Sequence, residues 1–396
     1  MTKEQRLKKR HNAEKRFRFY GLASIFFALL FVLILVHNIF SKGSSAFMKT
    51  AINVEVFYDK DLLELEPGAS EEEILEADFF DITIESLLKV YPAKNMDEED
   101  ALIELFTTDA EIEIKKAFLN NKNLIGKKIN LEITASDDID QLHKGNYPRD
   151  LPEDRRRISN FQLEIYDVLV ENKTITKNFN NYFFKNGDSR DPEIAGIGGA
   201  LVGSFYSILI CLLLAFPVAV LASIYLEEFA PKNKITDFIE ININNLAAVP
   251  SIVYGLLALQ ILLATIQLPR STPLVAGITL ALMTLPRIII PCRASLKAVP
   301  PSIREGALAV GASKFQSVFH HVVPLALPGT LSGTIIGLAQ ALGETAPLIL
   351  IGMVAFVVDI PFVEKTSATI MMLLSFLIVM NFLAVYLRQK FEKRWN

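Results

Sequence analysis

The stretch REGALAVGASKFQSVFHHVVP, residues 304–324, lies between two long apolar runs and predicts two short capped helices. Residues 302–305 have the S-x-x-E form of a capping box, which satisfies orphan amides at a helix start. Gly311 is expected to end this first helix, because glycine tolerates the left-handed backbone that is common just past a helix end. Residues 313–316 form a second box, S-x-x-Q, so a second helix should follow directly.

Apolar residues at helical spacing give the first of these helices one apolar side, formed by Ile303, Ala307 and Val310. Pro324 should break or kink the second helix where it enters the next apolar run. The prediction is a rigid helix–turn–helix, which suits a surface that pushes on another protein. The alternative is a connector that lies on lipid headgroups.

The composition indicates a membrane protein, since 51% of the 396 residues are hydrophobic and the formal net charge is only −4. Six apolar runs each reach the roughly 20 residues that are needed to cross hydrocarbon, whereas a buried helix of a soluble protein fits runs of about 10–14 residues. The predicted fold class is an all-α polytopic membrane protein with six transmembrane helices. They are expected at residues 19–40, 195–225, 246–266, 273–292, 328–356 and 368–387.

Basic residues near the spans predict the orientation of the chain in the membrane. Residues 1–18 are rich in Lys and Arg, and Arg388, Lys390, Lys393 and Arg394 follow the last span. Both termini are therefore expected on the cytoplasmic side, as an even number of spans requires. The stretch at residues 304–324 should face the same side.

Residues 41–192 are long enough for an inserted domain between the first and second spans, on the external side. β-forming residues at 47–59 and 127–135 predict strands, and residues 71–90 and 97–119 predict amphipathic helices, so the domain should be α+β. Its acidic clusters are interpreted as a solvated face, with a docking surface for a basic partner as the alternative. An acidic domain is a poor trap for an anionic solute.

The sequence shows no sign of an enzyme or of a cofactor site. Both cysteines, Cys211 and Cys292, lie in apolar spans, where they are interpreted as small residues of helix packing. There is no metal-ligand spacing, no phosphate-binding glycine loop and no nucleophile with its base.

Small residues recur every fourth position in the fifth run, at Gly329, Gly333 and Gly337, and allow close helix approach in lipid. The stripe is predicted to pack either inside the chain or against a second subunit. Glu344 lies beside it, and an acid at that depth usually faces a bundle interior or an aqueous path, which favours a functional role. The alternative is a structural ion pair or a hydrogen bond at a helix end.

The helix–turn–helix resembles the EAA loop of ABC importer permeases, which docks into a cytoplasmic ATPase. Glu305, Gly306, Ala307, Gly311 and Pro324 occupy that pattern and Arg304 precedes it, with Gly306 in place of the usual alanine. The runs LALMTLP (residues 280–286) and ALGETAPLILIGMVAF (residues 341–356) look more specifically like the PstA-type permease of the bacterial phosphate importer. The domain at residues 41–192 is similar to the longer variety of that family.

The resemblance implies a permease core at residues 193–396, with the coupling loop at about 300–324, in the bacterial inner membrane. It also implies an assembly with a PstC-type permease, two PstB-type ATPases and a periplasmic phosphate-binding protein, surrounded by lipid and with inorganic phosphate as substrate. ATP hydrolysis belongs to the ATPase chains, and neither a cofactor nor nucleic acid is implied. The alternatives are a permease for another oxyanion, a secondary transporter or a membrane sensor.

The expected phosphate path departs from the family pattern R-A-x-G-E-T-A-P, because Gln340 stands in place of the arginine, ahead of Glu344 and Thr345. Arg287, in the fourth run, is the predicted substitute for the missing charge. The alternative is that Arg287 extends to the cytoplasmic interface.

Overall fold

The computed structural model describes residues 3–66, 68–189, 191–354 and 363–392. The chain divides into two compact units: unit 1 comprises residues 1–196 and 357–372, and unit 2 comprises residues 197–356 and 373–396. The first turns of the last helix, α18 (Val363–Glu392), therefore belong to unit 1. The sequence analysis places them in the permease core at residues 193–396 instead.

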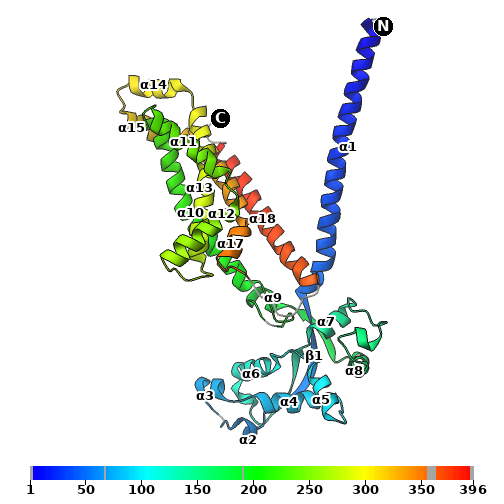
Figure 1. The fold of residues 1–396 in the computed structure, drawn as a ribbon. Helices are drawn as coiled ribbons and strands as arrows, with labels where there is room; N and C mark the ends of the chain where they lie inside the picture. Colours follow the sequence, from blue (N-terminus) through cyan, green and yellow to red (C-terminus); the bar gives the residue numbers. More distant parts are fainter. Residues whose placement is uncertain (1–2, 67, 190, 355–362, 393–396) are drawn as a thin grey trace. The chain divides into compact units, whose positions relative to one another are not determined.

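Unit 1 begins with α1 (Lys3–Gly43), a helix of 41 residues that contains the first predicted span (Figure 1). Its apolar side chains, such as Phe19, Phe26 and Leu33, are more than half exposed, as they would be on a helix that faces lipid or another subunit. The short helix η1 (Ser44–Phe47) leads from α1 into a folded domain, residues 44–196, which we call the α+β domain.

A three-stranded antiparallel sheet forms the centre of the α+β domain, in the order β2-β1-β3. β1 (Met48–Phe57) and β2 (Lys128–Thr134) confirm the two predicted strands, with Val54 opposite Leu131. β3 (Ile175–Phe179) was not predicted, because its sequence ITKNF has too few apolar residues to alternate clearly. Alternate residues of β1, among them Ile52 and Val54, are buried on one face of the sheet.

Helices cover the sheet, and both α4 (Phe80–Leu88) and α7 (Asp137–Lys144) pack against β1 (Figure 1). The helix predicted at residues 71–90 is two helices, because the backbone is extended at Ala77 and the Asp78 carboxylate accepts from the amide of Phe80. The helix predicted at residues 97–119 is also two separate helices in the structure. The helices of the domain are α2 (Lys60–Leu63), α3 (Glu71–Glu76), α4 (Phe80–Leu88), α5 (Met96–Ile103), α6 (Ala110–Asn120), η2 (Lys122–Leu124), α7 (Asp137–Lys144), η3 (Glu153–Arg155), α8 (Asn160–Glu171) and α9 (Asn181–Lys185).

Aromatic side chains fill the core of the α+β domain. Tyr58, Phe79 and Phe118 are almost completely buried, with the Phe118 ring centroid 5.2 Å from that of Tyr58 and 5.8 Å from that of Phe79. The buried Tyr58 hydroxyl donates to the carbonyl of Ile114 at 2.9 Å. The domain thus has a hydrophobic core of its own, and both cysteines of the chain lie outside it, in unit 2.

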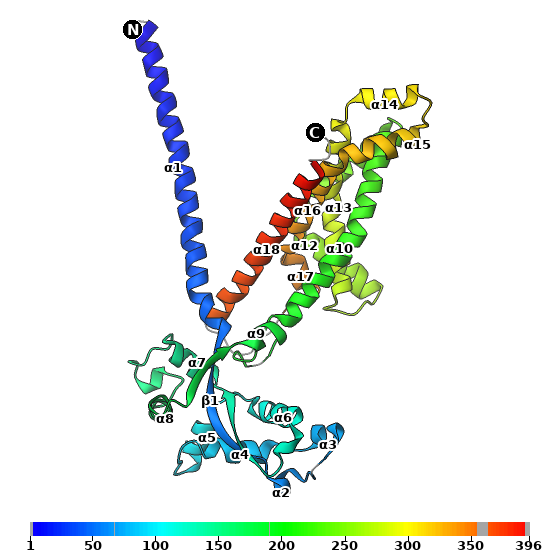
Figure 2. The same cartoon turned by 180° about the vertical axis from the view of Figure 1, so that it is seen from behind.

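Unit 2 is a helical bundle in which α10 (Gly198–Ile224) packs along α13 (Pro273–Ala298), and α13 packs along α16 (Val323–Leu342) (Figure 2). A Cβ added at Gly329 would lie 2.2 Å from Ser295, and one at Gly333 would lie 2.5 Å from Pro291. The two helices are thus antiparallel and in very close contact. The stripe that also includes Gly337 is filled by α13 of the same chain, so we do not propose an inter-subunit role for it.

Four helices in the described residues are long and apolar enough to cross a membrane: Arg10–Phe47, Gly198–Phe229, Pro273–Ala298 and Lys314–Leu342. A fifth span results if Lys234–Ala247 and Ser251–Thr265, which meet at 100°, count as one. The six-span count therefore stays a prediction, and α18 runs through the sixth predicted segment, residues 368–387.

Two predicted spans have different limits in the structure. The span at 246–266 straddles a bend before Pro250, with α11 (Lys234–Ala247) on one side and α12 (Ser251–Ala258) continuing into the π-helix η5 (Leu259–Thr265) on the other. The helix predicted at 328–356 ends at Leu342. After an irregular segment at 343–345 comes α17 (Ala346–Leu350), with Pro347 in its first turn, and residues 355–362 lie outside the described part of the chain.

Candidate functional site: a helical elbow and an ion pair

Two short helices at one end of the unit 2 bundle form a tight bend, which we call the elbow, residues 301–317 (Figures 1 and 2). α14 (Pro301–Ala309) is followed by Gly311 in the left-handed conformation, with φ of +89°, and then by α15 (Lys314–Ser317). The Gln316 amide donates to Ser313 Oγ at 3.2 Å, and the Ser313 amide donates to Gln316 Oε1 at 2.9 Å. The second predicted capping box and the glycine stop are confirmed.

The first predicted capping box is wrong. α14 begins at Pro301, its N-cap is Pro300 and no side chain caps it. A proline at the first helical position has a preset φ and no amide to satisfy, so the helix starts earlier than the serine pattern indicates. Ser302 and Glu305 both lie within α14, and the side chain of Glu305 is exposed.

Arg304 ties the elbow to the rest of unit 2. Its guanidinium donates to both carboxylate oxygens of Glu228, at distances between 2.6 and 3.2 Å. It also donates to the carbonyls of Leu296 at 2.9 Å and Val299 at 2.7 Å, at the C-terminal end of α13. The Glu228 side chain is 7% exposed, and it lies in the π-helix η4 (Tyr225–Phe229). Arg304 was predicted as a coupling residue; its contacts make it the internal anchor of the elbow.

A second set of ion pairs joins α13 to η4 and to the helix Lys234–Ala247. Arg293 lies 2.6 Å from Glu240 and 3.4 Å from Glu227, and Lys297 lies 3.6 Å from Glu227. Glu227 and Glu228 were missed by the sequence analysis. The available signal was the acid pair LEEF at the end of the second span, opposite the basic residues at the end of the fourth.

The outer surface of the elbow is apolar. Leu308, Val310 and Phe315 are 50%, 85% and 60% exposed. Val310 was expected on the packed side of α14, but the helix ends at Ala309 and Val310 turns outward, while Ala307 is buried as predicted. A Cβ added at the exposed Gly306 would meet no heavy atom within 4 Å.

Pro324 does not end the helix that follows the elbow. The chain passes from α15 through a π-helix, η6 (Val318–Val322), directly into α16, with Pro324 in the first turn of that element. A wider π turn accommodates a residue that cannot donate an amide and whose ring would clash with an ordinary α turn.

An ion pair lies near the other end of α16. Arg287 Nη1 of α13 donates to Glu344 Oε1 at 3.2 Å, and the two side chains are 20% and 17% exposed. Glu344 belongs to the irregular segment between α16 and α17. The next residue, Thr345, is exposed, and so is Gln340 in the last turn of α16. The structure thus brings two predicted path residues, Arg287 and Glu344, into direct contact.

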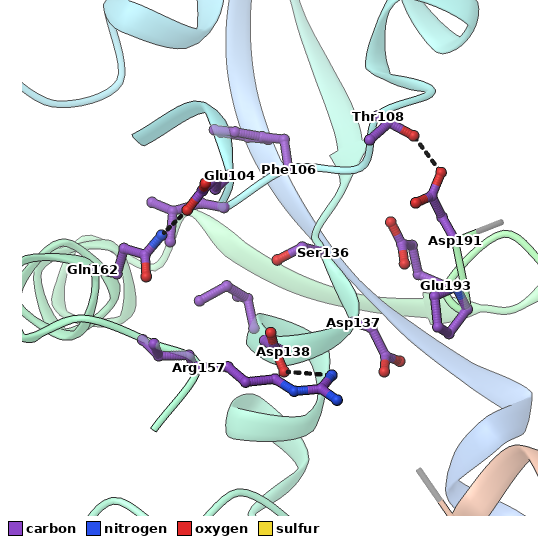
Figure 3. A pocket seen from close by; sticks show the side chains of 14 residues that line it. Glu104, Phe106, Thr108, Ser136, Asp137, Asp138, Arg157, Gln162, Asp191 and Glu193 are labelled. Atoms are coloured by element: carbon purple, nitrogen blue, oxygen red, sulfur yellow. Dashed lines mark hydrogen bonds and ion pairs between the residues drawn. The ribbon is translucent and has the colours of Figure 1, made fainter. Parts of the chain in front are cut away.

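A cavity of about 250 Å³ lies in the α+β domain (Figure 3). Its lining includes Glu104, Asp137, Asp138, Asp191 and Glu193 but only one basic residue, Arg157. Arg157 lies 3.9 Å from Asp138, and Thr108 donates to Asp191. An acidic lining repels anions, and no group of three or more His, Cys, Asp or Glu side chains in the described residues is arranged to hold a metal ion.

Two family models match the chain in two separate regions. The family described as "Binding-protein-dependent transport system inner membrane component" matches residues 198–396. A "Domain of unknown function (DUF3333)" matches residues 4–153, which include α1 and most of the α+β domain.

Individual relatives match part of the chain. The probable ABC transporter permease protein YqgI of Bacillus subtilis (strain 168) is 31% identical over 154 residues, which are 39% of this chain and 52% of that protein. The phosphate transport system permease protein PstA 1 of Mycobacterium tuberculosis (strain CDC 1551 / Oshkosh) is 33% identical over 160 residues, 40% of this chain and 51% of that protein. The chain spans about half the length of the curated relatives it matches.

An inward-facing structure of the MetNI methionine ABC transporter has 19% identity to this chain and a TM-score of 0.40. The match covers 50% of this chain and 94% of that one, and the likeness is too weak for a functional argument.

Proposed function

This chain belongs to the family of binding-protein-dependent transport system inner membrane components, and we propose that it is a permease subunit of an ATP-driven phosphate importer. Phosphate is the substrate named for several relatives that are 32–33% identical to it over the matched residues. In this proposal the chain forms half of the translocation path, and a separate ATPase chain hydrolyses ATP.

The elbow carries the coupling part of the proposal. Its apolar surface, formed by Leu308, Val310 and Phe315, is exposed. Arg304, in the same bend, is held in place by several hydrogen bonds. A rigid support beneath an exposed apolar surface is what a force-transmitting contact needs, because a flexible loop would absorb the motion of its partner. We assign Glu305, Gly306 and Gly311 to the same docking surface.

The proposed assembly contains a second, PstC-type permease, two PstB-type ATPases and a periplasmic phosphate-binding protein. The chain is a multi-pass protein of the inner membrane, with both termini and the elbow on the cytoplasmic side. The basic residues that precede the first apolar run support this orientation. The α+β domain is then external, and its acidic cavity makes capture of phosphate by the domain itself unfavourable.

The proposed phosphate contacts are Arg287 and Glu344, with Gln340 and Thr345 nearby. A guanidinium carries five N–H donors, and the bond to Glu344 uses one of its nitrogens, so other donors remain for an oxyanion. The Glu344 carboxylate can accept a hydrogen bond from the hydroxyl of hydrogen phosphate. Sulfate at neutral pH has no such hydrogen to donate, so the pair would favour phosphate over sulfate.

The coupling proposal is tested by purifying the assembly from membranes with the ATPase attached. We expect Val310→Asp and Glu305→Lys to leave the chain in the membrane but to reduce the retained ATPase by at least about tenfold, since both change the exposed surface. Arg270→Glu is the matched control, because Arg270 is exposed in the loop before α13, at the end that is remote from the elbow. Full ATPase retention in both elbow variants would refute the docking assignment.

The substrate is tested by uptake of labelled phosphate into cells that depend on this chain. Competition by excess unlabelled phosphate, and none by sulfate, is expected. Equal competition by sulfate would favour the alternative of a general oxyanion permease.

A further inference from the structure

The first turn of α18 contains a buried carboxylate, Glu364, that is only 3% exposed. It accepts hydrogen bonds from Ser45 Oγ at 2.7 Å, Gln141 Nε2 at 2.7 Å, Lys144 Nζ at 2.9 Å and Asn146 Nδ2 at 3.4 Å. One donor comes from η1, directly after α1, and the others come from α7 and the residues that follow it. A buried carboxylate is stable only where its partners are already in place, so Glu364 specifies how α18 meets the domain.

Lys144 extends this contact into the sheet. Its ammonium lies 2.6 Å from Asp140 Oδ2 as well as 2.9 Å from Glu364 Oε1, and all three side chains are 6% exposed or less. Asp140 Oδ1 in turn accepts the amide of Thr50 in β1 at 2.8 Å. A continuous series of buried polar contacts therefore runs from α18 through α7 to the central strand.

Lys365, the next residue of α18, makes a second charged contact with the domain. The residue is 8% exposed, and its ammonium lies 4.0 Å from Asp137 Oδ1 at the start of α7. Two consecutive charged residues at the start of an apolar helix are thus enclosed by protein instead of facing water.

The end of α1 packs against the same part of α18. A Cβ added at Gly43 would lie 2.7 Å from the amide nitrogen of Ala368 and 2.7 Å from Met371 Sδ. Only glycine permits this approach of the two backbones. The last residues of α1, the first turns of α18 and the α+β domain therefore meet in one contact region inside unit 1.

We propose that the α+β domain is a clamp that fastens the first turns of the last membrane helix to the end of the first membrane helix. The clamp assigns a role to the region that matches the domain of unknown function, which includes α1, Gln141, Lys144 and Asn146. It does not depend on the transported substrate. Removal of the domain would leave Glu364 without the donors Ser45, Gln141 and Lys144, and only the direct packing at Gly43 would then hold the start of α18 against α1.

Hydrogen exchange of the full-length chain tests the clamp without any transport assay. Glu364→Leu removes the contact to α18 but leaves the Lys144–Asp140 pair inside the domain intact. We expect amide exchange in residues 363–372 to become about 100-fold faster, because a buried charged contact has been lost. Amides of β1 and β2 should stay protected.

Ser45→Ala and Thr366→Leu complete the experiment. Ser45→Ala deletes one neutral donor to Glu364, so the domain should fold and exchange in residues 363–372 should rise by about fivefold to tenfold. If Glu364→Leu unfolds the domain, this variant decides the question. Thr366 is exposed in the same turn of α18, and Thr366→Leu should change nothing. Unchanged exchange in Ser45→Ala, or an equal rise in Thr366→Leu, would overturn the clamp.

Discussion

Two arginines of unit 2 each pair with a glutamate, but they use their hydrogen-bonding capacity very differently. Arg304 donates to both oxygens of Glu228 and to two backbone carbonyls, whereas Arg287 donates to Glu344 through one nitrogen at 3.2 Å. The Glu228 side chain is 7% exposed and the Glu344 side chain is 17% exposed. A guanidinium whose donors are used inside the fold supports structure, and one with donors to spare can bind an anion.

Arg304→Ala should have the largest effect. It leaves the buried Glu228 without its cation and removes the bonds to the end of α13, a loss of about 3–5 kcal/mol. The elbow should detach from the bundle, and purified complexes should lose the ATPase almost completely. Lys297→Ala is the control at the same end of α13, because Lys297 is 59% exposed and should contribute little. Equal ATPase retention in the two variants would contradict the structural role of Arg304.

Arg287→Ala should have a smaller and more specific effect. Loss of a charged contact to phosphate is expected to reduce uptake by about 10- to 100-fold, with assembly and ATPase retention unchanged. Gln340→Arg restores the arginine of the family pattern and should recover part of the uptake in the double variant. Arg287→Lys should be intermediate, since lysine keeps the charge but not the planar fork. Normal uptake in Arg287→Ala would rule out the relocated charge.

A charged cluster in the α+β domain offers a third case, in which negative charge is in excess. Burial raises the pKa of Asp137 to about 6 and that of Glu193 to about 7, although Lys365 opposes both shifts. Nearby carboxylates raise these pKa values further: Asp138, Asp140 and Glu364 act on Asp137, and Asp191 acts on Glu193. Hydrogen bonds from the backbone amide of Glu193 itself and from the Thr107 side chain lower the pKa of Glu193.

The sign of the pH dependence follows from these raised pKa values. The folded domain binds protons that the unfolded chain has already released, so this contribution to stability is complete below about pH 4 and is lost as the pH rises through 6 to 7. We expect the melting temperature of the domain, followed in the full-length chain, to fall by about 5 °C between about pH 5 and about pH 8. Asp137→Asn should flatten this slope, and the exposed Asp97→Asn should not. A slope unchanged by Asp137→Asn would exclude Asp137 as its source.

Gly306→Ala should have the smallest effect. Gly306 lies inside α14, and an added Cβ meets no heavy atom within 4 Å, so alanine should stabilise the helix by up to about 1 kcal/mol. The melting temperature should rise by a few degrees at most, and ATPase retention should be unchanged because alanine is the usual residue at this position of the EAA pattern. A lower melting temperature in Gly306→Ala would contradict the open space that the structure shows around Gly306.

Local patterns predicted local structure well. The Ser313–Gln316 capping box and the Gly311 turn depend on neighbours in sequence, and both are confirmed. The first box was wrong because Pro301 competes for the helix start and wins. β1 was clear from its alternation, but β3 exists only because it pairs with a strand more than 100 residues earlier.

Some of the long-range charge pairs could be predicted from the sequence, and others could not. Arg287 and Glu344 could be predicted, since each is an isolated charge within an apolar run. The Glu228 partner of Arg304 is 76 residues away, in a polar segment with several other acids, so no periodicity distinguishes it. The contacts of Glu364 span more than 200 residues and cross two predicted regions. Such contacts come from tertiary packing, which a single sequence does not encode as a pattern.

The π turn η6 connects the elbow to the glycine stripe of α16, and it sets the rotational phase between them. Each residue of an α-helix advances the side chains by about 100°. A π turn takes up about one residue more than an α turn for the same rotation, so losing one residue from Val318–Val322 can be absorbed by conversion to an ordinary turn, whereas gaining one would rotate Gly333 away from Pro291 or rotate Phe315 by the same amount. The interval between elbow and stripe should therefore tolerate the loss of one residue in this turn better than the gain of one.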